Sequence, residues 1–92
     1  MENKIRVVFR RTPKDGALIA FFHPEDIPAR HGNLMSYQTI GQHSEASITF
    51  YAECMPCKGN EYLTLYQELL MIGYDNLEIR ERLVMRRRRE TK

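Results

Sequence analysis

The N-terminal 22 residues constrain the fold more than any other part of the chain. From Lys4 to Arg10, apolar and polar side chains alternate, which is typical of a strand with one buried face and places Arg6 and Arg10 on the outer face. Residues 12–16 then set a proline before an Asp-Gly pair, a sequence that favours a tight turn. Residues 17–22 are apolar at every position. We therefore expect an antiparallel hairpin whose second strand is central in a sheet with something packed on each face.

The middle of the chain carries weaker signals. Residues 23–33 hold two prolines and a glycine, which predicts a surface loop. Residues 34–40 are predicted to form a third strand. Residues 44–53 are compatible with strand or helix, and we expect a short helical turn or an irregular segment there, with Ser44 available as a helix cap. Residues 54–60 are predicted to be a linker.

One main helix is predicted from residues that recur at helical spacing, which are Tyr62, Leu65, Tyr66, Leu69 and Leu70. Asn60 is placed to cap its start, and Gly73 to end it in a left-handed conformation. Residues 77–83 alternate again and carry several charges, which predicts a last strand at a sheet edge. We therefore expect an α+β domain over residues 1–85, with a mostly antiparallel sheet of about four strands and one main helix packed on one face, in the order β-β-β-(short element)-α-β.

The positive charge gathers at the C-terminus. Residues 86–92 contain five basic groups and one acidic group, so residues 1–85 carry a net charge of −2 in a chain of +2. A basic tail can contact phosphates. It makes nucleic-acid binding the alternative function, through Arg80, Arg82, Arg86, Arg87, Arg88 and Arg89. The competing interpretation is a solvated terminus that aids solubility.

A dense group of polar side chains is the leading candidate site, and it consists of Ser36, Tyr37, Gly41, Gln42, His43 and Ser44. We expect the third strand to end at Gly41, so that an amide, an imidazole and a hydroxyl follow from one bend. Backbone N–H groups in such a bend can contact an anion, and the imidazole can titrate near neutral pH. These features predict a site for a small polar or anionic ligand, such as a nucleotide, or for a host protein. The alternative is a loop whose side chains bind their own backbone.

Cys54 and Cys57 have a spacing found in metal and redox sites. No second pair at metal-site spacing accompanies them, so neither a metal nor another cofactor is predicted. Residues 50–58 are similar to the active-site segment of thioredoxin, which implies a lowered pKa at Cys54. The tryptophan usual before the first cysteine is absent, and no proline follows Cys57. We expect the two cysteines to be reduced and inert thiols. A thiol-redox enzyme, or an enzyme using His43 as a base or Cys54 as a nucleophile, is the third hypothesis, after ligand binding and nucleic-acid binding.

Three further segments form a pattern, namely Ser36-Tyr37-x-x-x-Gly41-Gln42-His43-x-x-Ala46, then Pro56, and Glu61-Tyr62-x-x-Leu65-x-x-Glu68-Leu69-x-x-x-Gly73-Tyr74. In these segments the chain resembles a family of small bacterial, plasmid- and phage-borne proteins of unknown function. The resemblance covers roughly residues 5–83 and implies an N-terminal hairpin, one helix and a mobile-element setting. Thr39 or its neighbour stands where many relatives carry another histidine, and Met55-Pro56-Cys57 replaces their linker.

The sequence therefore favours a small non-enzymatic binding protein of mobile-element type, such as a phage factor that sequesters a signal or blocks a host protein. A chain of 92 residues buries only a modest core, so oligomerisation would add stability. No apolar run approaches the ~20 residues that span a bilayer. The N-terminus shows no secretory signal, so we expect a cytoplasmic protein without a membrane partner.

Overall fold

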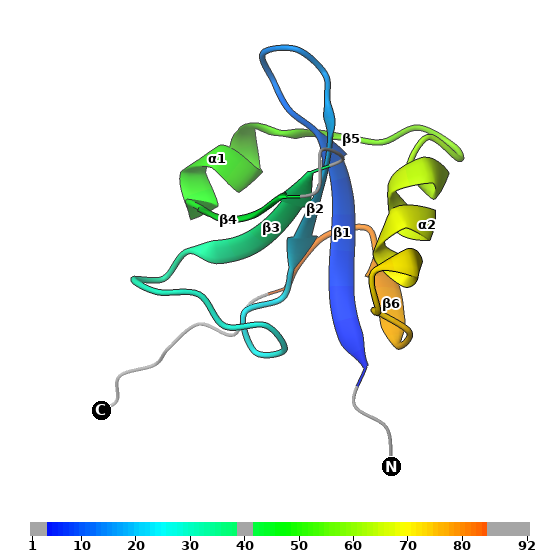
Figure 1. The fold of residues 1–92 in the computed structure, drawn as a ribbon. Helices are drawn as coiled ribbons and strands as arrows, with labels where there is room; N and C mark the ends of the chain where they lie inside the picture. The colour runs from blue at the N-terminus through cyan, green and yellow to red at the C-terminus, as the bar shows by residue number, and fades with distance from the viewer. Residues whose placement is uncertain (1–3, 39–41, 85–92) are drawn as a thin grey trace.

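The computed structural model describes residues 4–38 and 42–84, which form a six-stranded sheet with a helix on each face (Figure 1). The strands are β1 (Ile5–Arg11), β2 (Leu18–Phe22), β3 (Leu34–Gln38), β4 (Gln42–Ala46), β5 (Met55–Pro56) and β6 (Leu77–Arg80), and the helices are α1 (Ile48–Glu53) and α2 (Leu63–Met71). The predicted α+β class with a mostly antiparallel sheet is confirmed, although the sheet has more strands than expected. No helix in the described segments is long and apolar enough to cross a membrane.

The predicted N-terminal hairpin is confirmed. β1 and β2 pair antiparallel, with Phe9 opposite Ala20. The backbone N–H of Thr12 donates to the carbonyl of Ala17 at 2.9 Å, and Gly16 takes the positive φ of 69° that the turn requires. β2 lies between β1 and β3, which explains its continuous apolar sequence.

The other edge of β1 is shared by two strands. β5 pairs antiparallel with Arg10 and Arg11, and β6 pairs parallel with residues 5–8. Phe9 lies between these two pairings and has no register partner at this edge within the described chain. β6 ends at Arg80 rather than at residue 83, because the chain there leaves the sheet. The result is an open stretch of sheet edge flanked by β5 and β6.

Each face of the sheet carries its own apolar core. On the face covered by α2, the fully buried Leu65 and Leu69 pack against Val7, Phe9, Ala20, Phe22 and Tyr37. On the opposite face, α1 contributes Phe50 and Tyr51 to a cluster of Val8, Ile19, Phe21, Leu34, Cys54 and Leu83. Full burial of a side chain of this size contributes about 1.5–3 kcal/mol, so packing of Leu65 and Leu69 rather than helix propensity stabilises the short helix α2.

Residues 81–84, which we call the C-terminal strap, cover part of the α1 face. Leu83 is only 7% exposed, and its backbone N–H donates to the Tyr51 hydroxyl at 2.9 Å. Nε2 of the buried His23 ring donates to the Val84 carbonyl at 3.2 Å. Leu83 of the strap is therefore attached to α1 and Val84 to the residue that follows β2, and Leu83 completes the α1-face core.

The two helix starts differ from the predictions. Ser47 rather than Ser44 caps α1, and its side chain accepts a hydrogen bond from the backbone N–H of Phe50 at 3.0 Å. β4 pairs with β3 as far as Ala46, so Ser44 lies within a strand and α1 begins only at Ile48. The N-cap residue of α2 is Tyr62, without a side-chain capping bond, rather than Asn60. Ring stacking on β1 instead fixes the start of α2.

Candidate functional site

The polar segment that was predicted to form a bend is a strand. β4 pairs antiparallel with β3, with His43 opposite Tyr37 and Ser44 opposite Ser36. As the outermost strand of the sheet, β4 can carry polar side chains on both faces without burying them. Gly41, the predicted centre of the bend, lies outside the described residues. The expectation that Gln42, His43 and Ser44 present their side chains from one tight bend was therefore wrong.

The alternation of side chains along a strand divides the predicted site between two faces of the sheet. Tyr37 belongs to the α2-face core, and His43 lies opposite it on the same face. Ser36, Gln42 and Ser44 lie on the α1 face, where the Ser36 hydroxyl donates to the Ser44 carbonyl at 3.0 Å. The structure thus brings Tyr37 and His43 together on one face of the sheet, and Ser36 and Ser44 together on the other.

On the α2 face, Tyr37 and His43 meet two residues that sequence reasoning left out of the site. The Tyr37 hydroxyl donates to Glu68 Oε2 at 2.5 Å, and His43 Nε2 lies 2.8 Å from the Tyr74 hydroxyl. The hydrogen bond to the Glu68 carboxylate raises the pKa of Tyr37, and burial raises the pKa of Tyr74. These groups satisfy one another, so we interpret them as a polar junction between β4 and α2. Glu68 and Tyr74 both belong to the sequence segments that resemble the family of small mobile-element proteins. That resemblance was the one sequence feature that could have pointed to them.

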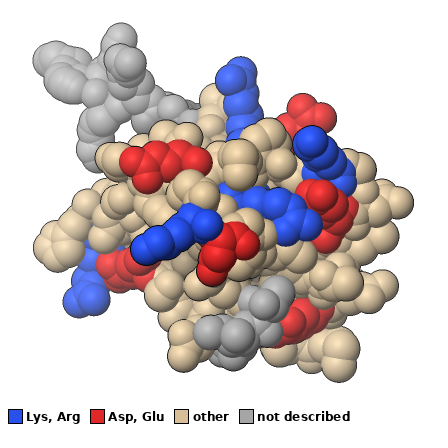
Figure 2. Space-filling model, turned by 90° about the horizontal axis from the view of Figure 1, so that it is seen from above, with Lys and Arg blue, Asp and Glu red and all other residues tan. Residues whose placement is uncertain are grey.

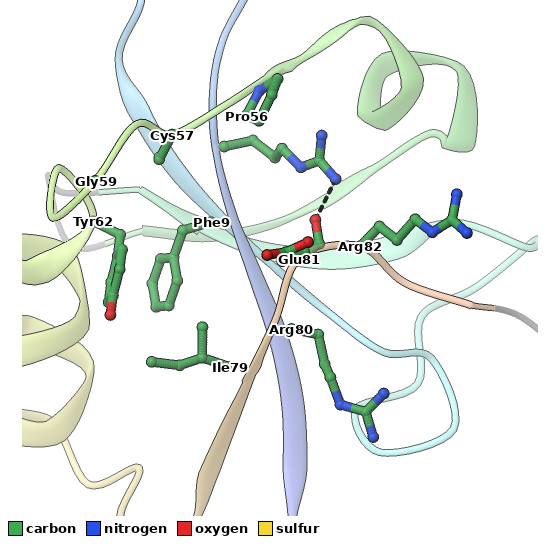
Figure 3. A pocket seen from close by; sticks show the side chains of 10 residues that line it. Phe9, Pro56, Cys57, Gly59, Tyr62, Ile79, Arg80, Glu81 and Arg82 are labelled. Carbon is green, nitrogen blue, oxygen red and sulfur yellow. Dashed lines mark hydrogen bonds between the residues drawn. The ribbon is translucent and has the colours of Figure 1, made fainter.

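A cleft of about 650 Å³ lies elsewhere, beside the open edge of β1 between β5 and β6 (Figure 3). Its volume is within the range of roughly 300–1,000 Å³ typical of small-molecule sites. One wall is apolar and includes Phe9, Pro56, Tyr62 and Ile79. The other end carries charged residues, which are Arg10, Arg80, Glu81 and Arg82. The cleft thus combines an apolar surface with charged groups.

The apolar wall is formed by two stacked rings. Phe9 and Tyr62 have ring centroids 5.2 Å apart and an interplanar angle of 21°. Ile79 continues this wall from β6 and is 40% exposed, which is high for a large aliphatic side chain. An exposed apolar surface of this kind inside a cleft is suited to the apolar body of a ligand.

Arg10 enters the charged end of the cleft from β1 and is held in place by several contacts. Its Nη2 donates to the Glu81 carbonyl at 2.6 Å (Figure 3) and to the Tyr51 hydroxyl at 3.4 Å. The guanidinium carbon lies 5.3 Å from the centroid of the Tyr51 ring. Its Nε is buried and has no hydrogen-bond partner among the described residues. Arg10 therefore offers a positioned cation with an unused donor.

The other charged residues of the cleft differ in how they are paired. Arg80 forms an ion pair with Glu78 at 2.6 Å, and both Arg80 and Arg82 point away from the apolar wall (Figure 3). The carboxylate of Glu81 forms neither a hydrogen bond nor an ion pair with any residue in the described segments, and the same holds for the guanidinium of Arg82. Arg10, Glu81 and Arg82 thus have charged groups with polar atoms that lack a partner among the described residues, and Glu81 is the one carboxylate among the residues that line the cleft.

A second cavity, of about 220 Å³, lies on the far side of β6 and is lined by Arg6, His23, Arg80, Arg82, Leu83 and Val84. Arg80 and Arg82, predicted as nucleic-acid contacts, therefore stand between the two cavities. The other four arginines of that prediction, at positions 86–89, lie outside the described residues. Their placement beside Arg80 and Arg82 stays a prediction.

The two cysteines do not form a redox pair in this structure. Both are free thiols, and they lie on opposite faces of the sheet, with Cys54 in the α1-face core and Cys57 packed against the α2-face core. Burial raises the pKa of each thiol, which is opposite to the lowered pKa expected from the thioredoxin-like segment. Among the described residues, no group of three or more His, Cys, Asp or Glu side chains is arranged to hold a metal ion.

Comparison of this chain with protein-family models, with curated proteins and with solved structures finds no match.

Proposed function

We propose that this chain is a small non-enzymatic binding protein that holds a small ligand, with an anionic group and an apolar body, in the cleft beside Arg10. The observation that carries the proposal concerns Arg10, which lines the cleft. Its Nε atom is buried and has no hydrogen-bond partner in the described chain. An unpaired buried donor costs about 1–3 kcal/mol, and a ligand oxygen would remove that cost. The ligand class is the one expected from the sequence, but the proposed site is not the segment from Ser36 to Ser44.

The arrangement of Arg10 supports binding rather than catalysis. Its contacts with Tyr51 and the Glu81 carbonyl hold the guanidinium before any ligand arrives, which lowers the entropy lost on binding. Neither His43 nor Cys54 lies among the residues of the cleft, so neither supplies a base or a nucleophile there. The family resemblance adds a mobile-element setting, in which such a protein would withhold its ligand from a host factor.

Titration with two small organic anions, AMP and 3-phenylpropionate, followed by NMR of the labelled protein, tests this proposal. We expect at least one of them to bind with a Kd of about 1 mM or tighter and to shift the signals of Tyr62 and Ile79. Arg10→Met should weaken that binding about tenfold or more, because it removes a charge-assisted hydrogen bond.

Arg11→Met is the matched control, since Arg11 is the next residue of β1 and does not line the cleft. It changes the net charge equally and also breaks an ion pair, with Glu61 at 2.9 Å. Its affinity for the same anion should stay within about twofold of the affinity of the unmodified protein. Circular dichroism verifies that both variants fold. Equal weakening by the two variants would contradict the proposal.

Nucleic-acid binding is the second candidate, and the position of Arg82 favours it. Arg82 has no partner in the described segments and precedes the basic residues 86–92 by only a few positions. On the face seen in Figure 2, however, Lys and Arg side chains are interspersed with Asp and Glu. This face therefore carries no continuous basic surface, and we expect binding to depend on the tail.

Deletion of residues 86–92 tests this second candidate. Affinity for a single-stranded oligonucleotide should fall steeply with salt concentration in the full chain and should be lost after the deletion. Fluorescence anisotropy with a labelled oligonucleotide measures both effects. Binding that survives the deletion, or that does not change with salt, would exclude this mode of recognition.

A further inference from the structure

We infer that the ligand of the cleft is a zwitterion, namely a free α-amino acid with an apolar side chain. This inference rests on the proposed function, because it assigns the anionic group to Arg10, and it adds a cationic group that contacts Glu81. The apolar side chain would lie against Phe9, Tyr62 and Ile79.

The first step concerns the two charges at one end of the cleft. Arg10 Nη2 contacts the main-chain carbonyl of Glu81 at 2.6 Å, so both residues stand side by side (Figure 3). Their charged groups nevertheless form no ion pair with each other in the structure. The buried Nε of Arg10 has no hydrogen-bond partner, and the exposed Glu81 carboxylate has none among the described residues. A guanidinium and a carboxylate in this relation can bind a carboxylate and an ammonium group on one ligand.

The second step concerns the class of ligand that these charges exclude. A ligand carrying only an anion would leave the Glu81 carboxylate without a partner, and a ligand carrying only a cation would meet the repulsion of Arg10, Arg80 and Arg82. In an α-amino acid the ammonium and carboxylate groups are attached to the same carbon, so one molecule satisfies both residues. A peptide lacks this pairing, because its two charged termini lie apart.

The third step concerns the apolar wall. The Phe9 and Tyr62 rings stack at 5.2 Å, and the partly exposed Ile79 lines the same cleft. A cleft of about 650 Å³ has room for a side chain as large as an aromatic ring. Contact with this wall selects an apolar side chain over a polar one.

Three probes that share one aromatic body test the inference, namely L-phenylalanine, 3-phenylpropionate and 2-phenylethylamine. The second lacks the ammonium group and the third lacks the carboxylate. Isothermal titration and NMR titration of the full chain should give an affinity for L-phenylalanine about tenfold or more above the affinities for the other two.

Glu81→Gln separates the contribution of the carboxylate. The backbone carbonyl that accepts from Arg10 remains, and the side chain is exposed, so the fold should be unaffected. The variant should bind L-phenylalanine about tenfold more weakly and 3-phenylpropionate equally well or more tightly, because the repulsion is removed. Glu53→Gln, an exposed position on α1 outside the cleft, is the control with the same charge change and should alter neither affinity.

The outcomes distinguish the inference from the function on which it rests. If 3-phenylpropionate binds through Arg10 as tightly as L-phenylalanine does, the zwitterion inference fails and the proposed function stands. The zwitterion inference also fails, with the proposed function intact, if Glu81→Gln weakens the binding of both ligands equally. If AMP alone binds, the ligand is a nucleotide and the amino-acid class is excluded. If no probe binds, both proposals fail.

Discussion

Replacement of Phe21 by alanine should lower the free energy of unfolding by about 3–5 kcal/mol, which is much of the roughly 5–15 kcal/mol available to a small domain. Phe21 is 0% exposed at the centre of the α1-face core. Its ring centroid lies 5.0 Å from that of Tyr51 and 6.3 Å from that of Phe50. β2 is paired on both sides, so the backbone cannot move inward to fill the cavity. Urea denaturation followed by circular dichroism measures the loss.

Met71→Ala is the control for this substitution. Met71 is 85% exposed at the end of α2, and its truncation should change stability by no more than about 0.5 kcal/mol. A cost below about 1 kcal/mol for Phe21→Ala would show that the α1 face lacks a packed core. Since Leu83 of the strap belongs to the same core, the variant should also increase hydrogen exchange at the Leu83 amide.

The hairpin and the main helix could be predicted because their signals are local. Alternation fixes the faces of β1, the Asp-Gly pair fixes the turn, and an uninterrupted apolar run places β2 inside the sheet. The end of α2 is equally local. Gly73 has a φ of 120°, and the backbone N–H of Tyr74 donates to the Leu69 carbonyl at 3.0 Å, as expected for a glycine that ends a helix.

The remaining strands depend on partners that are distant in the sequence. β4 has no apolar alternation and becomes a strand because β3 supplies five consecutive pairing positions. β5 has only two residues and exists because the chain passes the free edge of β1. β6 is parallel to β1, and its pairing of Leu77 with Ile5 joins the two ends of the domain. No short-range pattern contains this information.

The cleft was missed for a similar reason. Its residues come from β1, from the segment before α2 and from the end of β6. Sequence alternation placed Arg10 on the outer face of a half-buried strand, whereas Tyr51 and the strap cover it. One signal could have revealed it. If both faces of β2 are covered, then Arg10, which lies opposite the buried Ile19 in the hairpin, must also be partly covered.

Replacement of Asp26 by asparagine should lower the free energy of unfolding by about 2 kcal/mol at neutral pH. The Asp26 carboxylate accepts from the backbone N–H of Arg6 at 2.9 Å, from its Nε at 2.8 Å and from its Nη2 at 3.0 Å. The side chain of Asp26 is only 15% exposed, and that of Arg6 is 28% exposed. Asparagine has nearly the same shape but removes the charge and one of the two acceptor oxygens. Denaturation with guanidinium chloride measures the change.

Glu25→Gln separates this buried interaction from a surface charge effect. Glu25 contacts the same arginine at 3.3 Å with a side chain that is 50% exposed, so its replacement should change stability by about 0.5 kcal/mol or less. Equal losses in the two variants would contradict the burial argument. The hydrogen bonds from Arg6 lower the pKa of Asp26 in the folded state. The stabilisation is therefore complete above the unfolded value of about 4 and is lost as the pH falls through the lower folded value. The difference in stability between the unmodified protein and Asp26→Asn should accordingly shrink on acidification below roughly pH 4, while the Glu25→Gln difference stays small throughout.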